Sequence, residues 1–117
     1  MSKRAAGGRK GSVAEILLEL HLRELGLPFE REKRFSELRK WRLDFYLPEQ
    51  AIGIEVDGGV WSGGRHTRGK GFEADCIKAN HAIMAGIRLL RFSATQVKRG
   101  IAKAFISSQL GQKGREG

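Results

Sequence analysis

The sequence predicts an α/β domain in which a mixed sheet is flanked by helices, in the order helix, three strands, helix, strand, helix. Apolar residues recur with a helical period in three segments, they alternate with polar residues in the strands between, and glycine or proline separates the segments. At 117 residues the chain has the size of one domain with one core. We expect this domain to span residues 12–108, between a flexible basic arm (1–11) and a frayed tail (109–117).

The first helix is predicted to begin after Ser12, a typical N-cap residue, and to end at Gly26 ahead of Pro28. Ser12 and Glu15 also form the S-x-x-E pattern of a capping box. Helical spacing predicts a buried face made of Val13, Ile16, Leu17, Leu20 and Leu25.

The next three segments are predicted to be strands: "PFEREKRF", "WRLDFYL" and "AIGIEVDG". In the second strand, period-two alternation separates an apolar face with Trp41, Leu43, Phe45 and Leu47 from a face that carries Asp44. In the third strand, the same alternation puts Glu55 and Asp57 on one face and the β-branched residues on the other. A short turn at residues 48–50 joins these two strands in a hairpin.

The remainder of the chain is predicted to form a helix, a strand and a second helix. "FEADCIKANHAIMAG" has helical spacing through Phe72, Ile77 and Ile83 or Met84, and Gly86 ends it. "IRLLRF" reads as a short strand, and "SATQVKRGIAKAFISSQ" as a closing helix interrupted by Gly100.

The charge of the chain favours a polyanionic partner. The formal net charge is +9, which indicates nucleic acid first and a membrane surface second. No run of about 18 apolar residues exists, so we expect a cytoplasmic protein of a bacterium or a phage-infected host. Basic residues concentrate in the N-terminal arm and in a loop with six glycines between residues 58 and 71: Lys3, Arg4, Arg9, Lys10, Arg65, His66, Arg68 and Lys70.

The hairpin brings carboxylates together. If Leu47 lies opposite Ile52, counting back along both strands puts Asp44 opposite Glu55. Because opposed like charges destabilise a sheet, a divalent cation would relieve the repulsion, and Mg²⁺ prefers such oxygen ligands. Asp57 supplies a third carboxylate on the same face. In the alternative interpretation, this face is simply exposed and its acids pair with basic neighbours such as Arg42.

Carboxylates beside a basic loop suit phosphodiester hydrolysis. A metal ion held by acids lowers the pKa of a bound water and stabilises charge that develops on the phosphate. The cations of the glycine-rich loop can approach phosphates that carboxylates alone would repel. The sequence therefore predicts a metal-dependent site acting on nucleic acid.

The element order, with "RLDF" on the second strand and "IEVDGG" on the third, looks like the PD-(D/E)XK nuclease superfamily and its restriction-endonuclease-like core. Within it, "WRLDFYLPEQAIGIEVDGG" with the later His, Asp, Lys and "LLRF" is similar to small endonucleases related to very-short-patch-repair endonuclease, often found in phage-like genomes. "RKGSVAE" resembles the opening of archaeal-type Holliday junction resolvases, in which a serine and a helix glutamate lie beside the active site. The likeness covers about residues 10–100.

This resemblance implies a Mg²⁺-dependent endodeoxyribonuclease in which Mn²⁺ can substitute. It implies Asp44 as central metal ligand, Glu55 as second ligand and Glu15 as an acid from the first helix, with Ser12 near the DNA. For Glu15, the capping box is an equal alternative.

The sequence departs from the superfamily at Asp57, where a lysine is usual. Either Asp57 is a further metal ligand, or Lys78 supplies the positive charge. Lys78 could instead form an i,i+3 ion pair with Asp75. His66 is either a general base, since its ordinary pKa lies near neutrality, or a phosphate contact.

The expected substrate is branched DNA, in particular a Holliday junction, because 117 residues leave no room for a separate sequence-reading domain. Junction cleavage in recombination or repair would also suit a homodimer with two symmetric sites. The alternatives are a monomeric nicking or mismatch endonuclease of the very-short-patch type and a non-catalytic DNA-binding module.

Overall fold

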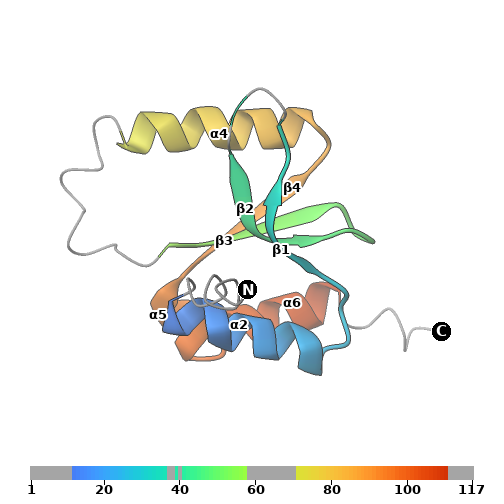
Figure 1. Ribbon diagram of the computed structural model, residues 1–117. Coiled ribbons are helices and arrows are strands. Elements are labelled where there is room, and N and C mark those ends of the chain that lie inside the picture. The colour runs from blue at the N-terminus through green and yellow to red at the C-terminus, as the bar shows by residue number, and fades with distance from the viewer. Residues whose placement is uncertain (1–11, 37–38, 40, 58–70, 111–117) are drawn as a thin grey trace, which may run out of the picture.

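The computed structural model describes residues 12–36, 39, 41–57 and 71–110 (Figure 1). Its elements follow the predicted order, and the closing helix is divided in two at Gly100, which has a φ of 79°. The elements are α2 (Val13–Glu24), β1 (Glu30–Arg34), β2 (Arg42–Leu47), β3 (Ile52–Asp57), α4 (Phe72–Met84), β4 (Arg88–Ser93), α5 (Ala94–Lys98) and α6 (Ile101–Gln109).

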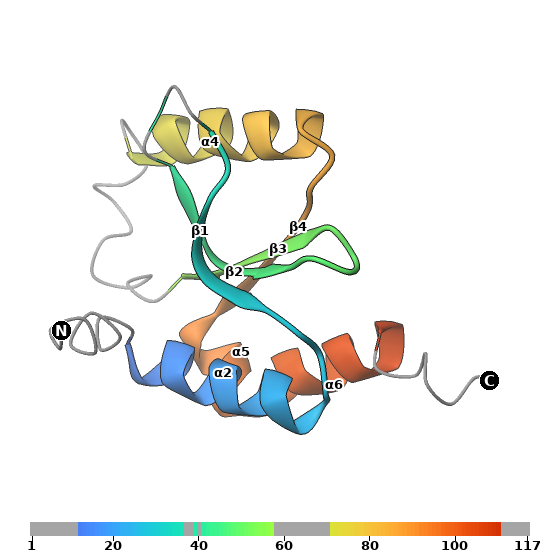
Figure 2. The same cartoon turned by 45° about the vertical axis from the view of Figure 1, so that its right-hand side comes forward.

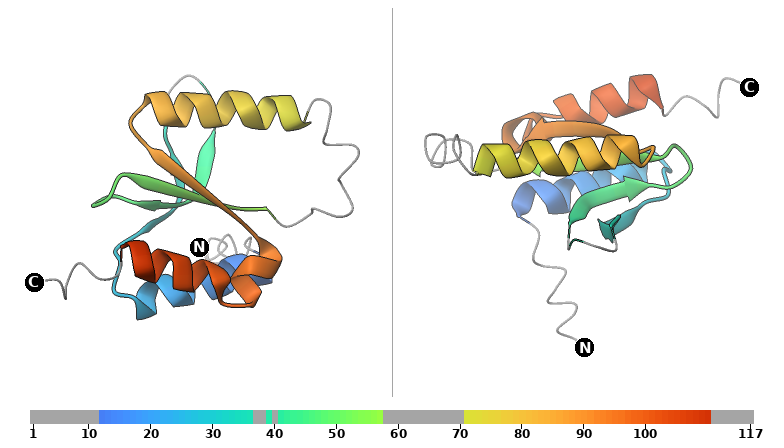
Figure 3. Two further views of the ribbon diagram at one scale, coloured as in Figure 1. Left: turned by 180° about the vertical axis from the view of Figure 1, so that it is seen from behind. Right: turned by 90° about the horizontal axis from the view of Figure 1, so that it is seen from above.

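The four strands form one mixed sheet in the order β1-β2-β3-β4. β1, β2 and β3 are antiparallel neighbours, whereas β4 runs parallel to β3 after the crossover through α4. Leu47 pairs with Ile52, which confirms the predicted hairpin register. The helices cover the two faces unequally: α4 lies alone on one side, and α2, α5 and α6 lie on the other (Figures 2 and 3). The predicted α/β class and mixed sheet are confirmed.

The larger core lies between the sheet and the three-helix layer, with Leu18, Phe45, Ile54 and Ile106 fully buried in it. A smaller core under α4 contains Leu43, Ala82 and Ile87. Among the described residues, no helix has the length and apolar character needed to cross a membrane.

The predicted apolar face of β2 is wrong in its first half, because Trp41 contacts His81 of α4 and Leu43 belongs to the core under α4. Leu43 and Phe45 should share a face by simple alternation, yet they belong to the two different cores. The β1–β2 pairing is interrupted at this level, between the pairs Arg31↔Phe45 and Lys33↔Leu43, where Glu32 adopts a left-handed φ of 50°. At this irregularity, which lies directly beside Asp44, the side chains of Leu43 and Phe45 point to opposite faces of the sheet.

The predicted buried faces of two helices are also wrong in part. In α2, Val13, Ile16 and Leu20 are exposed, and the buried residues are Ala14, Leu18 and Leu22. The period is helical as expected, but a helix this rich in leucine offers two apolar stripes, and the sheet takes the other one. In α4 the only buried residue is Ala82, while the large apolar residues Phe72, Ile77, Ile83 and Met84 are exposed.

Candidate functional site

Asp44 and Glu55 lie side by side at the end of the paired part of the hairpin. The backbone N–H of Asp44 donates to Glu55 Oε2 (3.2 Å), and that of Val56 donates to Asp44 Oδ2 (2.8 Å). Each carboxylate therefore accepts a hydrogen bond from the other strand's backbone, which fixes the orientation of both. The predicted juxtaposition is present, and backbone N–H groups of both strands help to orient the two carboxylates.

A second carboxylate grouping surrounds Asp44. Oxygen atoms of Glu15 from α2, Glu32 from β1 and Asp44 from β2 lie within 4.8 Å of one another. These acids supply only oxygen donors, which is the chemistry that Mg²⁺ and Mn²⁺ prefer. The side chains of Glu15, Glu32 and Asp44, with Glu55 next to them, therefore fit a hard divalent cation.

The carboxylates raise each other's affinity for protons. Burial and then the neighbouring Asp44 raise the pKa of Glu15 to about 7. Burial also raises the pKa of Asp44, and burial together with Asp44 raises that of Glu55. A cation bound among them would reverse this tendency, because it stabilises the ionised form of every acid in the cluster.

Arg31 balances part of the negative charge. Its Nη2 lies 2.9 Å from Glu15 Oε1 and its Nη1 lies 2.9 Å from Glu19 Oε1. Its Nε donates to the backbone carbonyl of Asp44 (3.2 Å), and the guanidinium stacks 4.5 Å from the centre of the Phe45 ring. Arg31 thus ties α2 to β2 at the level of the acids.

Only half of the predicted capping box is formed. Ser12 Oγ accepts a hydrogen bond from the backbone N–H of Glu15 (3.1 Å), as an N-cap should. The Glu15 carboxylate instead pairs with Arg31 and lies among the acids. Of its two predicted roles, the geometry favours a place at the site.

Lys78 pairs with Glu55 and not with Asp75. Its Nζ lies 3.0 Å from Glu55 Oε1, and the two side chains are only 22% and 18% exposed. The alternative interpretation is met in part: Glu55 pairs with a basic neighbour, which is Lys78 and not Arg42, but the pair is enclosed rather than exposed. Lys78 thus brings a positive charge to Glu55 from α4.

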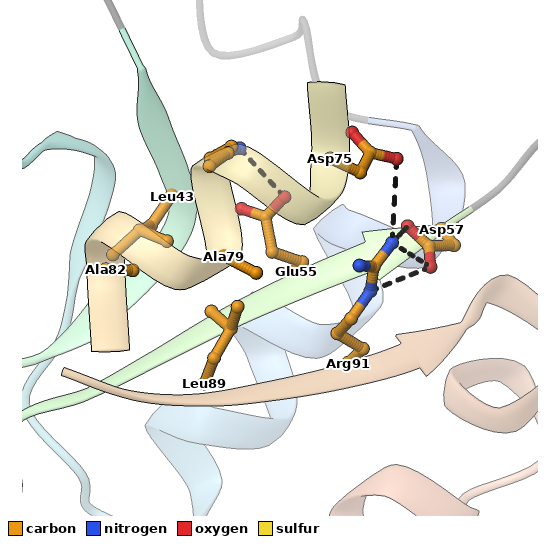
Figure 4. Close-up of a pocket in the computed structure, with 9 residues that line it drawn as sticks. Leu43, Glu55, Asp57, Asp75, Ala79, Ala82, Leu89 and Arg91 are labelled. Carbon is orange, nitrogen blue, oxygen red and sulfur yellow. Dashed lines mark hydrogen bonds and ion pairs between the residues drawn. The ribbon is translucent and has the colours of Figure 1, made fainter. Parts of the chain in front are cut away.

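Asp57 has a different environment from Asp44. Arg91 on β4 binds it through Nη2 at 3.0 Å and through Nε at 3.3 Å, and Asp75 lies 3.8 Å from the same guanidinium. These three residues line a pocket together with Glu55 and Lys78, under α4 (Figure 4). As the structure stands, the Asp57 carboxylate is occupied by Arg91.

The other predicted site residues lie outside the described part of the chain: His66, Arg65, Arg68, Lys70, Lys3, Arg4, Arg9 and Lys10. Ser12 is described, exposed, at the first turn of α2 beside Glu15.

Three residues of the site were not predicted from the sequence: Arg31, Glu32 and Arg91. Arg91 could have been found, since a parallel fourth strand in register with the third puts it beside Glu55. Glu32 follows only from the β1–β2 register, which a seven-residue connection without a turn signature does not specify.

Comparison with solved structures gives a match at the level of the fold. The catalytic domain of the homing endonuclease I-Bth0305I matches with a TM-score of 0.62 at 22% sequence identity, over 87% of this chain and 95% of that domain. At this identity the likeness establishes the fold and leaves the activity to be argued from the site. A scan of protein-family models finds no match, and neither does a search of curated proteins.

Proposed function

We propose that this protein is a metal-dependent DNA endonuclease that hydrolyses phosphodiester bonds with Mg²⁺, for which Mn²⁺ can substitute. The observation that carries the proposal is the adjacency of Asp44 and Glu55, with Lys78 3.0 Å from Glu55. The backbone N–H of Asp44 donates to Glu55, and that of Val56 donates to Asp44. The shared fold with a homing endonuclease catalytic domain supports this assignment by analogy.

The proposed metal ligands are Asp44 and Glu55, with Glu15 and Glu32 close enough to contribute oxygens directly or through water. When bound there, Mg²⁺ would lower the pKa of a water and offset the charge of the scissile phosphate. Lys78 would donate to a phosphate oxygen or to the attacking water from its position beside Glu55. Arg31 would keep Glu15 oriented through its hydrogen bond.

Several further roles follow from the resemblance. We keep His66 as a proposed general base. Asp57 could become a third ligand only after its carboxylate leaves Arg91. The proposed DNA contacts are Ser12, Lys3, Arg4, Arg9, Lys10, Arg65, Arg68 and Lys70, whose basic side chains would meet phosphates.

For the substrate we propose branched DNA of the Holliday junction type, cut by a homodimer in the cytoplasm of a bacterium or phage-infected host. The resemblance of "RKGSVAE" to the opening of archaeal-type Holliday junction resolvases supports this choice. Nicking of mismatched duplex by a monomer, as the very-short-patch resemblance implies, is the second candidate.

The test is cleavage of a synthetic four-way junction, a mismatched duplex and a plain duplex, each with Mg²⁺ and with EDTA. We expect Mg²⁺-dependent cleavage of the junction, lost in Asp44→Asn and Glu55→Gln while DNA binding is retained. Glu30→Gln is a matched control, because Glu30 is an exposed acid at the far end of β1 that pairs only with Lys33 among the described residues. Binding without cleavage under any divalent metal would identify a DNA-binding module instead, and cleavage of the mismatch alone would favour the second candidate.

A further inference from the structure

Three exposed arginines lie where β1 leads into β2: Arg34, Arg39 and Arg42, called here the arginine cluster. Arg34 and Arg42 are direct cross-strand partners. Like charges placed opposite each other destabilise a sheet, so this pair weakens the pairing of β1 with β2 unless an anion lies over it.

The arginine cluster differs from the other cations of the site in its ion pairs. Arg31, Lys78 and Arg91 each form an ion pair with a carboxylate. Within residues 12–36, 39, 41–57 and 71–110, no acid pairs with any of the three cluster arginines. In this part of the chain, the charge of the three arginines is therefore not offset by an ion pair.

Aromatic contacts hold Arg39 near α4. The Trp41 ring contacts Phe35 (5.9 Å between ring centres) and His81 of α4 (4.8 Å). The Arg39 guanidinium lies 4.9 Å from the Trp41 ring centre. A guanidinium on an aromatic face keeps its edge N–H groups directed outward, where they can bind phosphate oxygens.

The position of the cluster relative to Asp44 suits a strand of DNA. Arg42 precedes Asp44 by two residues on β2, a distance of about 7 Å along the strand. Arg42 is therefore close enough to Asp44 for its guanidinium to reach a phosphate next to one that lies at Asp44.

We propose that the arginine cluster is a DNA-backbone contact, adjacent to the active site, that binds phosphates flanking the cleaved bond. This inference rests on the proposed function for its choice of DNA. In this proposal, the repulsive Arg34–Arg42 pair serves DNA binding and does not stabilise the fold. Its residues differ from those of the basic arm and the glycine-rich loop.

The test is the salt dependence of duplex and junction binding in EDTA, so that affinity is measured without metal-dependent cleavage. Arg34→Gln/Arg42→Gln removes two contacts, and the slope of log K against log salt should fall in magnitude by about 1.8. Between 50 and 200 mM salt, the affinity ratio of wild type to variant should consequently shrink about 12-fold. The matched control is Arg88→Gln/Lys103→Gln, which removes the same charge at the start of β4 and on α6 and should change the slope much less.

Thermal unfolding separates binding from a structural role. Because the two arginines repel each other, the cluster variant should have a Tm equal to or above that of wild type while its DNA affinity falls. If wild type binds DNA and the variant has the same slope of log K against log salt, the proposal is overturned and the nuclease assignment stays intact. The same conclusion follows if the variant loses affinity for anionic lipid vesicles but not for DNA. A wild-type chain that binds no DNA would overturn both.

Discussion

The pKa of Glu15 makes a quantitative prediction for Glu15→Gln. Folding raises the pKa of this acid from 4.5 to about 7, chiefly through burial. For an acid whose pKa is raised, the stabilisation by its neutral form is complete below pH 4.5 and is lost as pH rises through about 7. A shift of this size corresponds to about 3 kcal/mol. Glutamine keeps the neutral form at every pH and can still accept the hydrogen bond from Arg31.

Without metal, Glu15→Gln should thus match wild type near pH 4 and exceed it by about 3 kcal/mol in unfolding free energy above pH 7. At about 4 °C per kcal/mol, this gain is a Tm increase of about 12 °C. Thermal and urea unfolding in EDTA from pH 4 to 9 measure it.

Glu19→Gln is the matched control. Hydrogen bonds from Arg23 and Arg31 lower the pKa of Glu19, so its ionised form stabilises the fold, and the variant should be less stable than wild type at neutral pH. Mg²⁺ should raise the Tm of wild type at pH 8 by more than that of Glu15→Gln, because only wild type retains the carboxylate. Equal stability of Glu15→Gln and wild type at all pH values would refute this account of the acidic cluster.

Three further predictions concern individual residues. Lys78→Gln should slow single-turnover DNA cleavage by about 10² or more with little change in DNA affinity, and Lys78→Arg should recover part of the rate; an unchanged rate would remove Lys78 from the site. Asp57→Asn should reduce cleavage less than Asp44→Asn and cost under about 1 kcal/mol in urea unfolding, because its pair with Arg91 is exposed; a loss equal to that of Asp44→Asn would make it a ligand. Gly53→Ala should cost about 1–3 kcal/mol in the free energy of unfolding by urea, because a Cβ there would lie 2.7 Å from Leu43 Cδ1 and 3.1 Å from Ile87 Cγ2. A stability equal to wild type would show that Leu43 and Ile87 can move to accommodate the added methyl group.

The hairpin could be predicted from the sequence because two signals agree. Period-two alternation identifies both strands, the turn at residues 48–50 sets their register, and the observed pair Leu47↔Ile52 follows from the two. Asp44 and Glu55 then become neighbours by counting. Local pattern was sufficient here because the connection is short.

The rest of the site depends on long-range packing, which local pattern does not encode. Glu32 lies opposite Asp44 because the β1–β2 register puts it between the pairs Arg31↔Phe45 and Lys33↔Leu43, and nothing in "EREKR" specifies that register. The sequence also does not specify which of the two apolar stripes of α2 is buried. In the structure, the buried stripe is the one that leaves Glu15 and Glu19 directed toward Arg31 on β1. For α4, helical period predicted an apolar core face, whereas the structure buries only Ala82 and turns Lys78 to Glu55.

The central claim is that a divalent metal binds at Asp44 and Glu55, and the most direct test is to locate it. Fe²⁺ can replace Mg²⁺ and, with ascorbate and peroxide, cuts the protein backbone near its ligands, so mass spectrometry of the fragments maps the site. We predict cuts near Asp44 and near Glu55 and Val56, suppressed by excess Mg²⁺ and absent in Asp44→Asn. Cuts that cluster elsewhere, or that persist unchanged in Asp44→Asn, would contradict the claim.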